Sequence, residues 1–119
     1  MSGVCLAHAD LTGTDCTGAH LYRADLRGAS LSRANLARAT LARANLDEAD
    51  LWRADLQGAD LGEADLREAD LRNANLTAAN LEGANLEGAH VGECPPEGLV
   101  LGPEWCIVDG FIRRVRETQ

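Results

Sequence analysis

The residues best suited to chemistry are acidic side chains that recur every five positions. The longest run of them comprises Asp50, Asp55, Asp60, Asp65 and Asp70. Closely spaced carboxylates can act as general acid and base. Asparagine replaces aspartate at equivalent places elsewhere, however, so ionisation is not required there. Short Asp and Asn side chains also bond backbone amides at corners of the chain. We therefore interpret the series as structural and predict no catalysis by it.

The other candidates for chemistry are three histidines and four cysteines. The sequence has no C-x-x-C pair, no Ser-His-Asp or Cys-His arrangement and no Gly-rich phosphate loop. We predict that the chain is not an enzyme and that it has no metal site and no cofactor. A disulfide between Cys94 and Cys106 stays open as an alternative to free thiols, although cytosolic proteins rarely keep such a bond.

The acidic residues belong to a five-residue repeat, Ala-(Asp/Asn)-Leu-x-x, whose places we call the first to fifth positions. It runs from Val4 to Glu93, with Leu third in 16 of 18 units, Ala first in 16 and Asp or Asn second in 13. A period of five gives no constant buried face to an α-helix, with about 100° per residue, or to a straight strand of period two. The pattern is consistent if the chain turns a corner once per unit, so that Ala and Leu point inward.

Repeats of fixed period are typical of solenoids. This stretch closely resembles the pentapeptide repeat family, whose pattern it follows over 90 of 119 residues. The resemblance implies an all-β fold, a right-handed quadrilateral β-helix with four units per coil, and 18/4 gives about 4.5 coils. We expect residues 1–93 to form the solenoid and residues 94–119 to form a C-terminal cap.

The C-terminal segment differs in composition from the repeats. Cys94-Pro95-Pro96 ends the pattern, because proline cannot donate to a ladder of hydrogen bonds. Large apolar residues then flank Asp109-Gly110, a dipeptide that favours the tight turn of a β-hairpin. We expect the hairpin to cover the open end of the solenoid. The same segment is a candidate homodimer interface, as the resemblance to relatives with C-terminal dimer contacts implies.

The charge balance limits the partners. The chain has 11 Arg, no Lys and 19 acidic residues, for a net charge of −8. This disfavours direct binding to nucleic acid or to an anionic membrane surface. No apolar run approaches the roughly 20 residues that span a bilayer, and no signal-peptide pattern opens the sequence. We expect a cytoplasmic protein.

Residues 20 apart should stack in columns if four units make a coil. One column places Trp52 between Ser32 and Arg72, so we expect the Arg72 guanidinium on the indole. Arg33 and Arg53 stack beside them with like charge. An aromatic side chain among arginines has the composition of an interface hot spot. We interpret Trp52, Arg33, Arg53 and Arg72 as a candidate surface for a protein partner; a merely solvated surface is the alternative.

Two other columns carry charges in sequence. One alternates in sign and the other brings two arginines above an acid: Arg27, Asp47, Arg67, Glu87; and Arg23, Arg43, Glu63. Exposed ion pairs of this kind usually contribute under about 1 kcal/mol each.

Charge also varies along the solenoid. Residues 14–53 hold six Arg and five acids, a balance of +1, whereas residues 54–93 hold two Arg and nine acids, a balance of −7. The charge of −7 in residues 54–93, spread over two coils, approaches the charge density of duplex DNA, about one charge per 1.7 Å. The resemblance to relatives that protect DNA gyrase and related topoisomerases by imitating DNA gives the alternative function. Outward acids with no evident structural role would carry it: Glu63, Glu68, Glu82 and Glu87.

Overall fold

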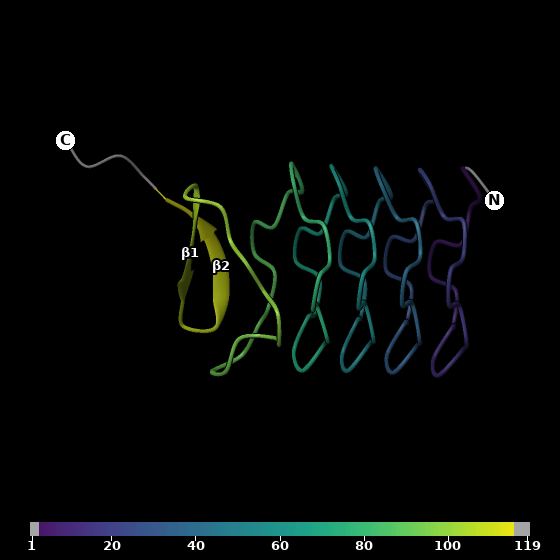
Figure 1. Ribbon diagram of the computed structural model, residues 1–119, viewed down its shortest axis with the longest axis horizontal. Helices are drawn as coiled ribbons and strands as arrows, with labels where there is room; N and C mark the ends of the chain where they lie inside the picture. The colour runs from purple at the N-terminus through teal and green to yellow at the C-terminus, as the bar shows by residue number, and fades with distance from the viewer. Residues whose placement is uncertain (1–2, 116–119) are drawn as a thin grey trace.

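The chain winds into a rod of stacked coils that ends in a small hairpin (Figure 1). The structure is a computed structural model and describes residues 3–115. Its two strands of regular length are β1 (Trp105–Val108) and β2 (Phe111–Arg114). In this described range no helix is long and apolar enough to cross a membrane.

The coils are held together at the second position of each repeat. Residues 20 apart in sequence pair there in parallel, as Asp25 does with Asn45 and Asn45 with Asp65. Each contact is an isolated bridge, because the chain turns away at the next corner. Four units therefore complete one coil, which confirms the predicted right-handed quadrilateral β-helix.

Unit 44–48, which has Asn in the second position, satisfies all five of its own backbone donors. In unit 44–48 the first N–H closes a turn onto the Leu41 carbonyl at 3.0 Å. The N–H of the second residue donates to a carbonyl of the preceding coil at 2.9 Å. The N–H groups of the third and fifth residues donate to carbonyls of the following coil at 2.7 and 2.9 Å. The fourth donates to Oδ1 of Asn45 at 3.0 Å. Because no N–H is left without an acceptor, the backbone can be buried against its neighbours without long strands.

The fifth position of the repeat has a left-handed backbone. Its φ is positive in 17 units, six with glycine and eleven with other residues, such as Arg38 at 59°. Arg38 is the third residue of a β-turn closed by the Ala39 N–H and the Leu36 carbonyl at 3.0 Å. A left-handed residue other than glycine costs roughly 1–2 kcal/mol. The sequence pattern does not reveal this requirement, because only some units place glycine there.

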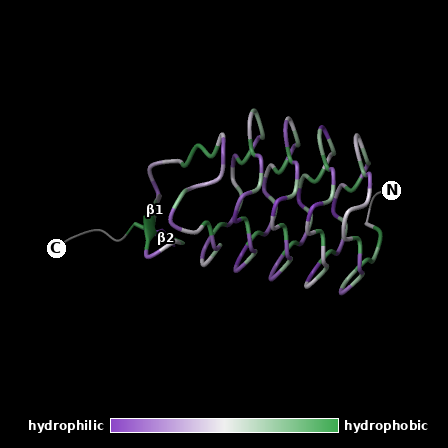
Figure 2. Ribbon diagram, turned by 90° about the horizontal axis from the view of Figure 1, so that it is seen from below, coloured by the Kyte–Doolittle hydropathy of each residue, from purple (hydrophilic) through white to green (hydrophobic). Residues whose placement is uncertain are grey.

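Leucine and alanine fill the interior, as predicted. From Ala24 to Leu76 the first and third positions are at most 2% exposed, and no polar or charged side chain of residues 3–115 is buried. Figure 2 shows hydrophobic and hydrophilic stretches alternating within each coil. The leucines of the first coil, such as Leu11, are only half-buried, because a neighbouring coil covers them on one side.

The C-terminal hairpin closes the other end of the rod. Val108 pairs with Phe111, so Asp109-Gly110 is a two-residue loop, and both of its residues have positive φ as a type I′ turn requires. The Ile112 N–H and carbonyl bond to Ala89 and Gly88 of the last coil, each at 2.8 Å. Ile112 and Trp105 are buried over the core. The predicted capping hairpin is confirmed.

The chain reaches this cap by a detour around its prolines. Pro95 and Pro96 break the 20-residue register, but Glu97 then pairs with Asn75, 22 residues before it. The Leu76 N–H donates to the Glu97 carbonyl at 2.7 Å. Two extra residues thus carry the chain past the break and return it to the coil.

Cys94 and Cys106 are free thiols. Of the two alternatives for this pair, the structure therefore has the reduced one. The Cys106 thiol donates to the Arg113 carbonyl, with Sγ 3.6 Å from the oxygen.

We expect Leu56→Ala to lower the free energy of unfolding by about 2–5 kcal/mol, as truncation of a buried leucine does. Leu11→Ala is the matched control and should cost less, because Leu11 is only half-buried. Denaturant unfolding followed by circular dichroism measures both. Equal and small losses would contradict the assignment of the third position to the interior.

Candidate protein-binding surface

The Asp and Asn residues of the second position share one structural task. All 13 Asp and Asn residues there accept a hydrogen bond from the backbone N–H two residues on, at 3.0–3.2 Å. Asp and Asn serve equally, because only the Oδ1 acceptor is used. This confirms the structural interpretation of the series.

Three of these aspartates also bind an arginine in the fourth position of the same unit. The pairs are Asp25 with Arg27, Asp65 with Arg67, and Asp70 with Arg72. The Arg67 side chain hydrogen-bonds the Asp65 carboxylate and holds the pKa of Asp65 below its usual value, against the opposing effect of partial burial. Arg27 and Arg67 therefore bind within their own units, and not along the column of alternating charges.

The second charged column does pair between coils. Arg43 Nε lies 2.8 Å from Glu63 Oε2, although Glu63 is in the coil that follows. The second residue of the Arg43 unit is Thr40, so this unit offers no carboxylate to Arg43. This contact gives Glu63 a partner that the sequence analysis did not assign to it.

Trp52 lies beneath two guanidinium groups. The guanidinium carbons (Cζ) of Arg33 and Arg53 are 5.1 and 4.9 Å from the centroid of its ring. The indole is half-buried, and its backbone N–H donates to Asp50 Oδ1 at 3.0 Å. We call Trp52, Arg33 and Arg53 the Trp52 cluster.

The predicted contact of Arg72 with Trp52 is wrong. The Arg72 Nη2 atom lies 2.7 Å from Oδ2 of Asp70, two residues before it. A charge-assisted hydrogen bond to a nearby carboxylate is stronger than attraction to an exposed aromatic face. The structure thus brings together three of the four predicted residues and turns the fourth away.

The Trp52 cluster has an unbalanced positive charge. Neither Arg33 nor Arg53 forms an ion pair with any residue between 3 and 115. Both are exposed, in the left-handed fifth position, with φ of 61° and 58°. They are on neighbouring coils of one face, and both guanidinium groups lie near the same indole ring.

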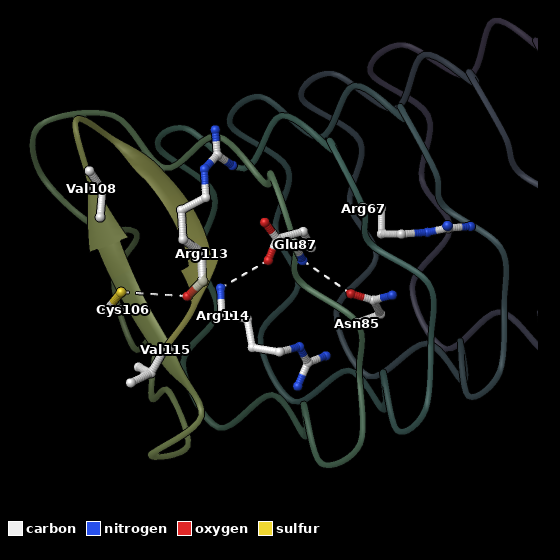
Figure 3. Close-up of a pocket in the computed structure, with 8 residues that line it drawn as sticks. All are labelled: Arg67, Asn85, Glu87, Cys106, Val108, Arg113, Arg114 and Val115. Carbon is white, nitrogen blue, oxygen red and sulfur yellow. Dashed lines mark hydrogen bonds between the residues drawn. The ribbon is translucent and has the colours of Figure 1, made fainter. Parts of the chain in front are cut away.

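Two of the four outward acids predicted to lack a structural role have one. Glu63 binds Arg43, and the Oε2 atom of Glu87 accepts the Arg114 backbone N–H at 2.9 Å (Figure 3). The second contact forms because the hairpin folds back beside the last coil. The side chains of Glu68 and Glu82 have no hydrogen bond or ion pair within the described range.

Beside this Glu87 contact lies a cavity of about 760 Å³ between the cap and the last coils (Figure 3). Its lining joins basic, acidic and apolar side chains: Arg67, Asn85, Glu87, Cys106, Val108, Arg113, Arg114 and Val115. Arg67 is bound to Asp65, and the Arg114 guanidinium lies 4.4 Å from the centroid of the Trp105 ring. Of the contacts at this cavity, the bond from the Arg114 N–H to Glu87 joins the cap to the solenoid.

A cluster of acids lies elsewhere on the rod. Carboxylate oxygens of Asp47, Glu48 and Glu68 lie within 4.8 Å of one another. The sequence analysis missed this cluster, although the 20-residue spacing of Glu48 and Glu68 signals it. It concentrates negative charge at the middle of the solenoid.

A quadrilateral β-helix of five-residue units defines a class of repeat protein. The family model for pentapeptide repeats matches residues 1–36, 34–73 and 54–90, with 8 copies. The chain belongs to the pentapeptide repeat family.

Solved structures of the same family resemble the chain. Rfr23 from the cyanobacterium Cyanothece 51142 is 38% identical with a TM-score of 0.71, over 71% of this chain and 58% of that protein. HetL, involved in heterocyst differentiation regulation in Nostoc sp. strain PCC 7120, is 42% identical with a TM-score of 0.56, over 85% and 51%. The chain thus spans little more than half the length of these two proteins.

QnrB1, a plasmid-mediated fluoroquinolone resistance protein, is 21% identical with a TM-score of 0.49, over 83% of this chain and 58% of that one. A likeness this low has no bearing on function. No curated protein sequence matches the chain.

Acid should weaken the Asp65–Arg67 pair. The pKa of Asp65 is lowered in the folded state, so the stabilisation is complete above about pH 4 and is lost as the pH falls through that lowered pKa. Asp65→Asn keeps the Oδ1 acceptor and removes the charge. We expect it to reduce the free energy of unfolding slightly at neutral pH, with a gap from the wild type that closes as the pH falls through the lowered pKa of Asp65.

Asp55→Asn is the control, because Asp55 bonds the Gln57 N–H and has no arginine partner in the described structure. Urea unfolding across the pH range measures the three proteins. A gap for Asp65→Asn that does not change with pH would contradict the ion-pair assignment.

Proposed function

We propose that the chain is a non-enzymatic interaction scaffold that binds a protein partner through the Trp52 cluster. The observation that carries this proposal is the pair of guanidinium groups without an acidic partner over one half-buried indole. Tryptophan and arginine dominate the residues that contribute most to binding at protein interfaces. A partner that covered the cluster would exclude water and strengthen the attraction between the cations and the ring.

The scaffold supports this role by fixing the backbone under the cluster. The Arg33 N–H donates to the Trp52 carbonyl at 2.8 Å, and the Arg53 N–H donates to the Arg72 carbonyl at 3.0 Å. The backbone of the cluster therefore needs no ordering when a partner binds. A preorganised surface loses less conformational entropy on association than a loop does.

A second candidate function is imitation of DNA toward gyrase or another type II topoisomerase. The balance of −7 in residues 54–93 favours it, as do Glu68 and Glu82, which no hydrogen bond or ion pair engages in the described range. Imitation of DNA would also require a homodimer in which the two caps are in contact. Four large apolar side chains of the cap support that contact by their exposure: Val100, Ile107, Val108 and Val115.

Trp52→Ala should weaken capture of the partner from the native cell. It should change the free energy of unfolding by no more than about 0.5 kcal/mol, as changes outside the core usually do. Tyr22→Ala is the matched control, because Tyr22 is also an outer aromatic with an arginine, Arg23, 5.4 Å from its centroid. Equal capture by the wild type and Trp52→Ala would overturn the proposal.

The DNA-mimic alternative is tested by supercoiling with purified gyrase. If it holds, the wild-type protein inhibits the enzyme or relieves a quinolone, most strongly at low salt. The double variant Glu68→Gln and Glu82→Gln should act more weakly, because it shifts the 54–93 balance from −7 to −5. No effect of the wild type on supercoiling, or a monomer in sedimentation velocity, would count against this alternative.

A further inference from the structure

We infer that the Trp52 cluster binds an acidic segment of its partner, with one carboxylate held between the guanidinium groups of Arg33 and Arg53. This inference rests on the proposed function and names the chemistry of the partner. It follows from the charges left unbalanced at the cluster, from the geometry of the two arginines and from the charge of the rest of the rod.

The arginines of the repeat fall into two groups. Those in the fourth position bind the aspartate of their own unit, as Arg27, Arg67 and Arg72 do. Those in the fifth position form no such pair: the units of Arg33 and Arg43 have Ser30 and Thr40 second, and Arg43 pairs with Glu63 one coil further. One coil further along the column, Arg33 meets Arg53, and Arg53 meets Asn73. Neither arginine therefore has a neighbouring acid in the column that would balance its charge.

The two guanidinium groups lie close to the same aromatic ring. Their Cζ atoms lie 5.1 and 4.9 Å from the same ring centroid, so they are at most 10.0 Å apart, the sum of these distances. Flexible arginine side chains on a fixed backbone can close around a single carboxylate from this starting position. Its two oxygens can then accept from both groups, and charge-assisted hydrogen bonds of this kind are the strong ones. The carboxylate would also remove the repulsion between like charges.

The surroundings favour a short acidic segment over a long polyanion. The chain has a net charge of −8, and the balance of −7 lies in the adjoining residues 54–93. A nucleic acid strand following the rod would run against this half and be repelled. A carboxylate beside an apolar residue fits the cluster, because the apolar residue can pack against the half-buried indole. We therefore assign the site to a peptide segment that pairs Glu or Asp with an aliphatic side chain.

A labelled peptide of alternating glutamate and leucine residues tests the inference directly. Fluorescence anisotropy should show saturable binding to the full chain, weaker at higher salt. The same peptide with glutamine in place of glutamate should bind at least about tenfold more weakly, because the charge-assisted hydrogen bonds are lost. Arg33→Gln and Arg53→Gln should each weaken binding of the glutamate peptide by a similar factor.

Arg38→Gln is the matched control. Arg38 is also in the fifth position, with φ of 59°, and forms no ion pair within the described range, but no aromatic ring lies beside it. This variant should bind the glutamate peptide as the wild type does. Thermal unfolding of each variant checks that the fold is kept.

Three outcomes would overturn the inference: no binding of the glutamate peptide, equal binding of the glutamine peptide, or loss of binding in Arg38→Gln equal to that in Arg33→Gln. Its failure can be told apart from failure of the proposed function. If Trp52→Ala loses the native partner while Arg33→Gln and Arg53→Gln keep it, the surface binds a partner that is not acidic. If all three variants keep the partner, both proposals fail.

Discussion

One hydrogen bond at most corners governs the rest of this structure. In the 13 units with Asp or Asn second, that side chain accepts the N–H of the fourth residue, as Asn45 does for Asp47. That N–H points away from both neighbouring coils, so no backbone carbonyl is available to it. With the side-chain acceptor in place, the chain can turn every five residues and direct Ala and Leu inward at each turn. The 20-residue register, the dry core and the stacked columns all follow from this corner.

The same corner decides which surface charges are neutralised. It places the second-position carboxylate next to the fourth residue of its unit, where Arg67 and Arg72 bind it. It then turns the fifth residue into a left-handed conformation, away from that carboxylate. A fifth-position arginine is paired only when the next coil supplies an acid. Arg33 has Ser30 in the second position of its own unit and Arg53 one coil further, so no acid faces it. Arg53 has Asp50 in its unit but forms no ion pair with it, and Asn73 lies one coil further.

The period of five was enough to predict the fold, because only a chain that turns once per unit gives leucine a constant side. It also placed the columns, and with them Trp52, Arg33 and Arg53. It could not place Arg72, because column stacking ignores competition from the aspartate two residues earlier. It could not assign Glu87 to Arg114 either, since that bond depends on the backbone path of the hairpin. The return of Glu97 to the coil likewise needs the detour around two prolines.

The interior and the outer columns of this protein are energetically separate. Ala and Leu determine the stacking of coils, while the fourth and fifth positions can change without altering the core. A column that brings two like charges together therefore lowers stability slightly without disturbing the fold. Local conflicts of this kind are where functional sites are expected in an otherwise consistent structure. In this chain the conflict coincides with the half-buried Trp52, and this makes the cluster a stronger candidate than the evenly spaced aspartates.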